Sequence, residues 1–196
     1  LMSAAADWLL APGAGLGCLL CGSPGDAIVE GLATAAREKG WSVCLATDLA
    51  REEHREAGRE IEAGLKRLAQ VEGAGADPLL IVGVGSSGTA AFLQACRSRR
   101  VGALAIVDVP LILDALDAQR PVQPLEMLLN LDVPLLRVES MGPSVLEPEH
   151  SQRVDLQLDA FSRDHQSHRI PSADLRSHLV FFLLEAFLST HLETLP

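Results

Sequence analysis

The stretch Leu79-Leu80-Ile81-Val82-Gly83-Val84-Gly85-Ser86-Ser87-Gly88-Thr89-Ala90-Ala91-Phe92-Leu93 decides the fold. Apolar residues come first, glycines and serines follow, and the last part has the character of a helix. This order predicts a buried parallel strand that enters a helix through a tight turn. Such a turn exposes backbone N–H groups at a helix N-terminus, where the helix dipole favours anions or developing negative charge. The turn is therefore the first candidate for a functional site.

Composition limits the classes of protein to consider. A chain of 196 residues suits one α/β domain, and we expect residues 1–196 to form it. Hydrophobic residues make up 48% of the chain and charged residues 21%, which is typical of a globular protein. The net charge of −10 argues against nucleic acid and against anionic membrane surfaces as partners. The apolar run Leu179–Leu184 is too short to insert across a bilayer.

We expect a soluble protein. The sequence does not select a compartment: we expect either the cytoplasm or, if a signal segment was trimmed before Leu1, which is not a methionine, the periplasm. Cys18 and Cys21 form a CxxC inside a predicted strand, where three steps place the two sulfurs on opposite faces. That position favours buried small hydrophobic residues over a redox or metal motif. We expect no metal and no cofactor, since no second CxxC or paired histidine motif supports a zinc site.

Predicted strands and helices alternate along the chain, which calls for a three-layer α/β/α sandwich around a mostly parallel sheet. We expect Leu79–Val82 near the sheet centre, and no large lid domain in the short connection between Asp108 and Pro134. The predicted strands are Asp7–Leu10, Gly17–Cys21, Trp41–Thr47, Leu79–Val82, Val101–Val107, Pro134–Val138 and Arg153–Leu158. Helices are predicted from Asp26 to about Lys39, over Arg51–Val71, after the glycine-rich turn, within Leu111–Leu131 and over Asp174–Leu192.

Loops are predicted over Glu139–Glu149 and Asp159–Ala173. We expect the terminal helix to face inward with Phe182, so that Phe182→Ala costs about 3–5 kcal/mol of stability. Ligands of such folds bind at the carboxyl ends of the strands. Residues that follow predicted strands are therefore the site candidates.

Several of these segments resemble the α/β-hydrolase superfamily. Cys18-Leu-Leu-Cys-Gly-Ser-Pro-Gly-Asp26 is similar to its oxyanion-loop strand, and Leu80–Ala91 resembles its nucleophile elbow. The "LxxLxVPLL" pattern of Leu125–Leu136 resembles the segment before the family's acid. The likeness covers nearly the whole chain. It implies a small single-domain member similar to dienelactone-hydrolase-like and lipase-like proteins, and closest to a bacterial hydrolase-like family of unknown function.

The elbow motif of that family is Gly-x-Ser-x-Gly, and two registers compete here. In the first, Ser86 is the nucleophile and Val84 stands where glycine is wanted. In the second, Gly83-Val84-Gly85-Ser86-Ser87-Gly88 matches Gly-x-Ser-x-Gly-Gly, and Gly85 replaces the serine. The pattern favours the second register. It predicts Gly85 at the apex of a degenerate elbow, with Ser86 and Ser87 as polar caps of the following helix.

The resemblance also implies an acid and a histidine. Asp108 and Glu139 follow predicted strands and are the two candidates for the acid; otherwise Asp108 is a helix cap and Glu139 an exposed loop residue. His165 falls where the family keeps its catalytic base, and it is otherwise a solvated loop histidine. We expect the His165 loop at the same sheet edge as Gly85–Ser87.

Three hypotheses of function follow. One is a degenerate hydrolase-fold protein with an impaired or absent triad that acts in binding. Another is a serine esterase or thioesterase, in which Ser86 attacks a small ester and the backbone N–H groups of Ser87 and of Gly22–Ser23 form the oxyanion hole. The last is a phosphosugar-binding domain built on Gly83–Ser87. A small acyl or apolar molecule is the expected ligand, and the sequence carries no signal of oligomeric state.

Overall fold

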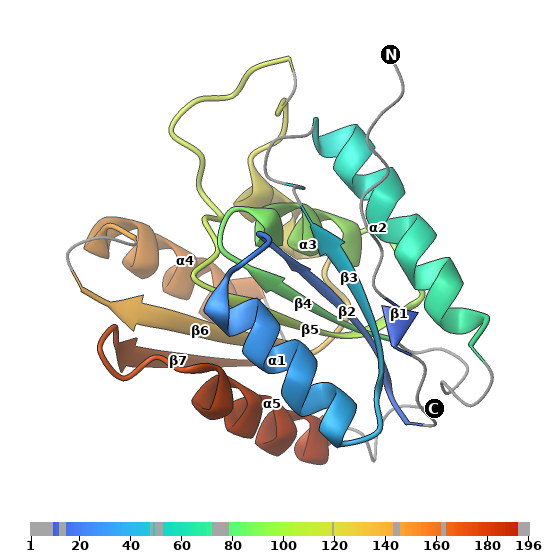
Figure 1. Ribbon diagram of the computed structural model, residues 1–196. Helices are drawn as coiled ribbons and strands as arrows, with labels where there is room; N and C mark the ends of the chain where they lie inside the picture. The colour runs from blue at the N-terminus through green and yellow to red at the C-terminus, as the bar shows by residue number, and fades with distance from the viewer. Residues whose placement is uncertain are drawn as a thin grey trace.

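The computed structural model describes residues 10–11, 15–47, 49, 53–71, 79–118, 120–142, 146–161 and 164–191. Within these ranges seven strands form one sheet in the order β1-β3-β2-β4-β5-β6-β7 (Figure 1). Strand β1 is antiparallel to β3, and all other neighbours are parallel. The strands are β1 (Leu10–Ala11), β2 (Gly17–Gly22), β3 (Ser42–Thr47), β4 (Leu79–Val84), β5 (Val101–Val107), β6 (Leu135–Met141) and β7 (His165–Pro171).

Helices cover both faces of the sheet, as predicted for a three-layer sandwich (Figure 1). Helices α1 and α5 pack on one face, and α2, α3 and α4 pack on the other. Strand β4 is fourth of the seven and is buried along its whole length, which confirms the predicted sheet centre. The helices are α1 (Ala27–Glu38), α2 (His54–Ala69), α3 (Ser87–Ala95), the 3₁₀ helix η2 (Pro124–Asn130), α4 (Pro148–Phe161) and α5 (Ser177–His191).

The start of α1 follows the sequence prediction. The Asp26 carboxylate accepts hydrogen bonds from the backbone N–H groups of Ile28, at 2.8 Å, and Val29, at 3.3 Å. This is the N-cap interaction that the turn before α1 predicts. The predicted Asp7–Leu10 strand lies almost entirely outside the described residues, and only Leu10 of it belongs to β1.

The prediction of a strand over Arg153–Leu158 is wrong, because this segment lies inside α4. The alternation of Val154, Leu156 and Leu158 suggested a two-residue period. In the structure Val154 and Leu158 are fully buried, whereas Leu156 is 70% exposed. The apolar spacing that matters is therefore i to i+4, which is helical. The predicted Glu139–Glu149 loop is also shorter than expected, since β6 continues to Met141 and α4 begins at Pro148.

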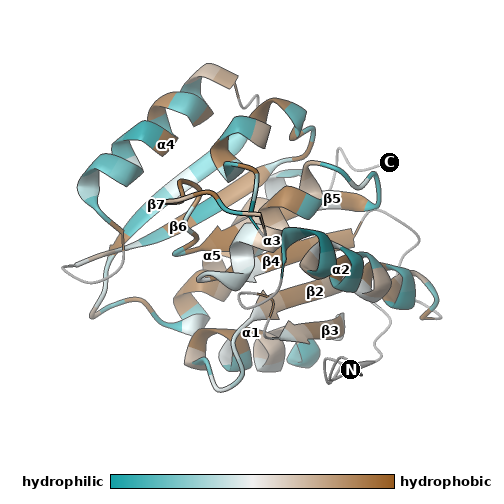
Figure 2. Cartoon of the chain, turned by 90° about the horizontal axis from the view of Figure 1, so that it is seen from above, coloured by the Kyte–Doolittle hydropathy of each residue, from teal (hydrophilic) through white to brown (hydrophobic). Residues whose placement is uncertain are grey.

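The predicted loop over Asp159–Ala173 contains the edge strand β7. Only Ile170 of this strand is buried, so its sequence lacks the apolar pattern by which a strand is recognised. Figure 2 shows the contrast: hydrophobic colour covers the central strands β2 and β4, whereas α4 and β7 are largely hydrophilic.

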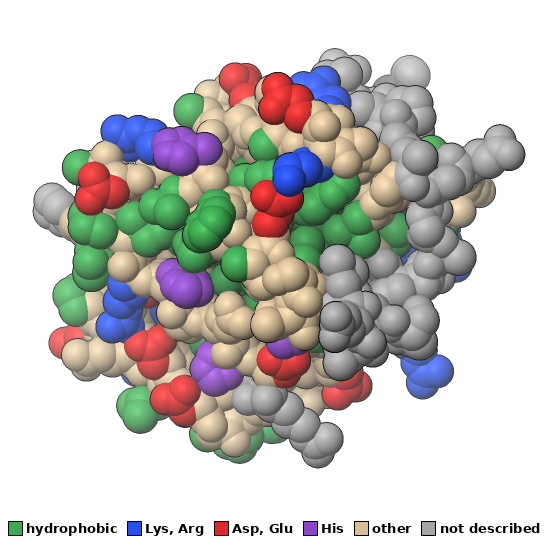
Figure 3. Space-filling model, turned by 90° about the horizontal axis from the view of Figure 1, so that it is seen from below, with side chains coloured by type: hydrophobic (Ala, Val, Ile, Leu, Met, Phe, Trp, Pro, Cys, Tyr) green, Lys and Arg blue, Asp and Glu red, His purple; other side chains and the backbone are tan. Residues whose placement is uncertain are grey.

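The prediction that Phe182 faces inward is also wrong. Phe182 is 65% exposed, and the buried residues of α5 include Phe181, Leu184 and Phe187. Because every position from Leu179 to Leu188 except Glu185 is apolar, the sequence period of this helix does not select one face. Figure 3 shows hydrophobic side chains among acidic and histidine side chains on the side of the molecule seen from below. Because the Phe182 ring is exposed, Phe182→Ala leaves no cavity in the core, and the cost of about 3–5 kcal/mol does not apply.

The connection from β5 to β6 holds only η2 as a regular element among its described residues, in keeping with the absence of a large lid. No helix among the described residues combines the length and the apolar character needed to cross a membrane.

Candidate functional site

The turn between β4 and α3 has the geometry of a nucleophile elbow. Strand β4 ends at Val84 and α3 begins at Ser87, so Gly85 and Ser86 make the whole turn. Gly85 has a φ of +57°, in the left-handed region, whereas Ser86 has a φ of −64°. An elbow holds its apex residue in the strained region, which glycine adopts without strain. Gly85 therefore occupies the apex, as the second register of the motif predicts.

Two other glycines let α3 lie directly on β4. A Cβ atom added to Gly83 would lie 2.6 Å from the Cα atom of Gly88 and 3.0 Å from the Cβ atom of Ala91. A Cβ atom added to Gly88 would lie 2.2 Å from a methyl group of Val109. The distances of 2.6 Å and 2.2 Å are too short for real contacts, and the distance of 3.0 Å is tighter than most. The close packing of an elbow is thus present although its apex carries no hydroxyl group.

Neither serine of the turn acts as the expected side-chain cap. Ser86 is exposed and makes no capping hydrogen bond. Ser87 is fully buried, and its hydroxyl group has no hydrogen-bonding partner within the described residues. Of the two, only Ser86 presents its hydroxyl group to a ligand in solvent.

The candidate oxyanion loop lies beside the elbow. Strands β2 and β4 pair with Cys21 opposite Gly83, so Gly22 and Ser23 follow at the level of Val84 and Gly85. Gly22 is buried, and an added Cβ atom would lie 2.2 Å from a methyl group of Val29 on α1. Ser23 is exposed. The fold thus brings the candidate binding residues Gly22, Ser23, Gly85 and Ser87 to one edge of the sheet.

Asp108 lies at the same edge, at the end of β5. It has a φ of +51° and is the one described residue other than glycine in the left-handed region, which aspartate tolerates better than most residues. Its carboxylate accepts a hydrogen bond of 2.6 Å from the backbone N–H of Ser140 on β6. The helix-cap interpretation is wrong, since among the described residues between Asp108 and Pro124 no helix begins. The carboxylate instead ties β5 to β6.

His165 does not lie where the resemblance implied. It is the first residue of β7 and pairs with Leu135, the first residue of β6. By register, His165 is three residues short of the level of Val84, or about 10 Å along the strand direction. Its Nε2 atom lies 3.3 Å from a carboxylate oxygen of Asp159. The expected meeting of His165 with the elbow is therefore wrong, because the predicted loop is a strand that His165 begins.

Glu139, the other acid candidate, is buried with 4% of its surface exposed, so its interpretation as an exposed loop residue is wrong. The Nη2 atom of Arg137 donates a hydrogen bond to its carboxylate, and the Nε atom of Arg169 lies 3.7 Å away. Asp155 of α4 completes the group: it accepts hydrogen bonds from Arg137, at 2.5 Å, and from Arg169. We call Arg137, Glu139, Asp155 and Arg169 the charged ring, because each carboxylate lies between the two guanidinium groups.

The charged ring was missed in the sequence, although a signal was present. Arg137 and Glu139 flank Val138 in an otherwise apolar strand, so they point to the same face of the sheet. Charged side chains on a buried strand require partners of opposite charge. The contact of Asp155 with these residues was not predicted, because the segment that contains Asp155 was predicted as a strand and is a helix.

His150 is a further polar group that the sequence did not single out. Its Nε2 atom accepts hydrogen bonds from the backbone N–H groups of Leu111, at 3.1 Å, and Ile112, at 3.3 Å. Its buried Nδ1 atom has no partner within the described residues. Burial lowers the pKa of His150; the nearby Glu139 carboxylate opposes this shift, and Arg137 acts in the same direction as burial. A neutral imidazole therefore holds the segment after β5 against α4.

The cysteines carry no sign of a reactive or metal site. Cys18 belongs to the core under α1 and α5, and Cys21 belongs to the core on the other face, as predicted. Burial raises the pKa of Cys44 to about 11 and that of Cys96 to about 12, so both stay protonated thiols near pH 7. Within the described residues, no three histidine, cysteine or acidic side chains are grouped as metal ligands.

No protein-family model matches the chain, and no curated protein matches its sequence. Solved structures are similar in fold. A structure described under the metagenome-derived lipolytic enzymes LipS and LipT is similar at a TM-score of 0.73 and 14% identity. The alignment covers 96% of this chain and 99% of the other. Est1E from Butyrivibrio proteoclasticus is similar at a TM-score of 0.76 and 13% identity, over 95% and 94%. An esterase of Pyrococcus furiosus reaches 0.74 and 11% identity, over 93% and 84%.

These likenesses, together with the sheet order and the elbow, define the fold class: the protein has an α/β-hydrolase fold. At 11–14% identity the similarity shows the fold alone.

Proposed function

We propose that the protein is an α/β-hydrolase-fold protein without an elbow nucleophile, and that it binds a small molecule instead of cleaving an ester. The observation that carries this proposal is Gly85 at the elbow apex, with a φ of +57° and no side-chain hydroxyl group. Where catalysis is not needed, glycine at this position removes the nucleophile and the backbone strain of about 1–3 kcal/mol together.

The surroundings of the elbow support the proposal. The turn from Ser172 to Arg176, between β7 and α5, contains no histidine. The Glu139 carboxylate accepts a hydrogen bond from Arg137. The Asp108 carboxylate accepts one from the backbone N–H of Ser140. A general base needs to lie within hydrogen-bonding reach of the nucleophile, directly or through one water molecule. That His165, the base which the resemblance implied, begins β7 instead of lying at the level of the elbow supports the proposal.

The alternative functions fit less well. A serine esterase requires Ser86 to act from a right-handed helical conformation beside the apex, with His165 on another part of the sheet. A phosphosugar site on Gly83–Ser87 requires the hydroxyl group of Ser87, which is fully buried.

Ester hydrolysis tests the proposal. We expect the purified protein to show no turnover of p-nitrophenyl acetate or butyrate above the buffer rate, and Ser86→Ala to behave identically. Ser189→Ala is the matched control, because Ser189 is an exposed serine of α5. Turnover that Ser86→Ala abolishes and Ser189→Ala retains would refute the proposal and restore the serine esterase.

A further inference from the structure

Strand β7 forms one edge of the sheet, and alternate residues of its backbone point away from β6. Within the described residues, no strand pairs with this outer edge. The backbone N–H of Ser172 donates to β6, and the backbone carbonyl of Asp164 accepts from β6. The residues that alternate with these two, namely His165, Ser167 and Arg169, therefore direct their N–H and C=O groups outward. An open edge of this kind is a template on which another strand can pair.

Helix α5 lies between α1 and this edge and carries an apolar surface (Figure 1). Glu185 forms an ion pair of 2.7 Å with Lys39, which follows α1, so this side of α5 faces α1. Because successive residues lie about 100° apart around a helix, Leu183 points to the opposite side of α5, toward the edge. Phe182, beside it, is 65% exposed.

We call the apolar residues on this part of α5 the apolar stripe: Leu179, Phe182, Leu183 and Ala186. They follow one another at intervals of three or four residues or lie side by side, so they form one continuous surface. The view from below, where β7 and α5 lie, shows hydrophobic side chains on this face of the molecule (Figure 3). An exposed apolar surface next to an open strand edge is typical of an interaction site.

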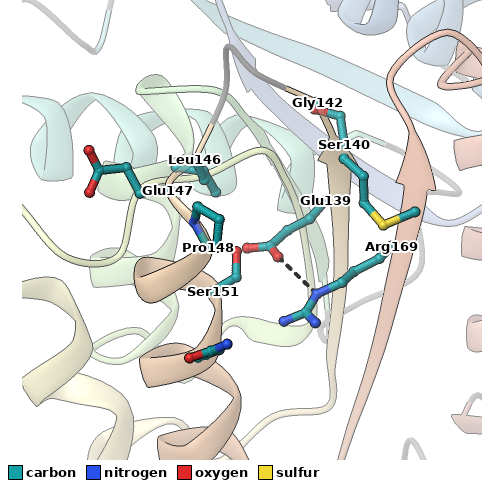
Figure 4. Close-up of a pocket in the computed structure, with 10 residues that line it drawn as sticks. Glu139, Ser140, Gly142, Leu146, Glu147, Pro148, Ser151 and Arg169 are labelled. Carbon is teal, nitrogen blue, oxygen red and sulfur yellow. Dashed lines mark ion pairs between the residues drawn. The ribbon is translucent and has the colours of Figure 1, made fainter.

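The charges along β7 indicate the direction in which a second strand would pair. Near the first residue of β7, Asp159 is 75% exposed and lies 3.3 Å from His165. Near its end, Arg169 is 43% exposed and extends toward Glu139 beside the cavity that Figure 4 shows. Antiparallel pairing of β7 with a second β7 places the acidic beginning of each strand beside the basic end of the other. Parallel pairing would place like charges together.

We propose that the protein forms a symmetric dimer, in which β7 pairs antiparallel with β7 of a second copy and the apolar stripes of the two α5 helices face each other across the joined strands. A two-fold axis through the middle of β7 generates this pair, and two-fold dimers are the commonest symmetric oligomers. A second copy suits this surface because one symmetry operation provides a partner for the open strand, for the stripe and for both charged ends.

The register of the two strands follows from the position of Pro171. Proline has no backbone N–H, so a pairing that uses Pro171 loses a hydrogen bond. An axis at Ser167 pairs His165 of each copy with Arg169 of the other and leaves Pro171 opposite a residue that precedes β7. Each Arg169 then lies opposite His165 of the other copy and next to its Asp159. Ser167 is therefore at the centre of the interface.

Sedimentation of the purified protein over a concentration series from micromolar to millimolar tests the inference, and we expect the wild type to form dimers within this series. Ser167→Pro should weaken dimerisation at least about tenfold, because it removes an outward N–H at the axis from both copies and leaves the hydrogen bonds between β7 and β6 intact. Ser167→Ala is the matched control, since alanine keeps the N–H, and it should dimerise as the wild type does.

Phe182→Glu tests the apolar stripe separately. Phe182 is exposed, so the variant should fold, and a charge placed against the other copy should weaken dimerisation about tenfold or more. Thr34→Glu is its matched control, because it adds the same charge at an exposed residue of α1 and should dimerise as the wild type does.

Each of four results would overturn the inference: a wild type that stays monomeric throughout the series, unchanged dimerisation of Ser167→Pro, unchanged dimerisation of Phe182→Glu, or equal weakening by Ser167→Ala and Ser167→Pro. If circular dichroism shows that Ser167→Pro does not fold, Phe182→Glu and its control decide. None of these outcomes bears on ester turnover, so failure here is distinct from failure of the proposed function.

Discussion

The carboxyl ends of β4 and β6 lie on one edge of the sheet, and they are built from opposite chemistry. At the end of β4, Gly83 and Gly88 let α3 pack backbone to backbone, and the residues of β4 and its turn, Leu79–Ser86, carry no charge. At the end of β6, Arg137 and Glu139 are buried as ions, because α4 supplies Asp155 from above the sheet. The comparison teaches that the end of β4 is built for close backbone packing, whereas the buried charge lies two strands away on β6.

The largest expected effect comes from breaking the charged ring. Arg137→Met removes the cation that both carboxylates share and leaves Glu139 buried with only the distant Nε atom of Arg169. Loss of one partner from a buried ion pair costs about 3–5 kcal/mol, and we expect that loss in urea-induced unfolding. Arg169→Gln, at the more exposed cation, should cost about 1 kcal/mol or less. Equal costs for the two variants would contradict the assigned difference in burial.

Gly83 of β4 and Gly85 of the following turn should show an intermediate effect that separates packing from conformation. In Gly83→Ala the new methyl group meets the backbone of Gly88, and overpacking of this kind costs roughly 1–3 kcal/mol. In Gly85→Ala the methyl group has no neighbour within 4 Å among the described residues, but the φ of +57° costs a residue with a side chain roughly 1–2 kcal/mol. Thermal unfolding measures both. Full stability of Gly85→Ala would mean that the apex is not left-handed.

The smallest expected effect is the pH dependence carried by His150. Burial lowers its pKa below the usual 6.5, so folding favours the neutral form. The unfolded chain then binds more protons, and this stabilisation is complete above pH 6.5 and is lost as the pH falls below that value. Urea unfolding at pH 7.5 and pH 5.5 measures the loss.

His150→Gln is the control for that measurement, because a glutamine oxygen accepts the same backbone N–H groups and does not titrate. Burial also lowers the pKa of His54, which remains in both proteins and cancels in the comparison. If the free energy of unfolding of His150→Gln fell between pH 7.5 and pH 5.5 by as much as that of the wild type, His150 would be excluded as the source of the pH dependence.

The sequence predicted the fold well for strands that are covered by helices on both faces. The apolar run of β4 and its glycine turn predicted the strand, the helix and the Gly85 apex, because each of these depends on local residues. It failed where partners come from distant segments. β7 is a polar edge strand, so its sequence lacks an apolar pattern. The exposed Leu156 of α4 gave that helix an apparent two-residue period, and Phe182 lies on a helix that is apolar at most positions. The charged ring joins side chains of β6, α4 and β7, which are distant in the sequence, so its members did not form a local pattern.

Reaction with a fluorophosphonate, followed by intact-protein mass spectrometry and peptide mapping, tests the central claim most directly. The reagent forms a covalent adduct with an activated serine nucleophile in a folded hydrolase. With glycine at the apex and His165 three residues short of the level of the elbow, we predict that the folded protein keeps its unmodified mass while an active serine hydrolase treated in parallel is fully labelled. An adduct that maps to Ser86, and that is absent from Ser86→Ala, would contradict the claim.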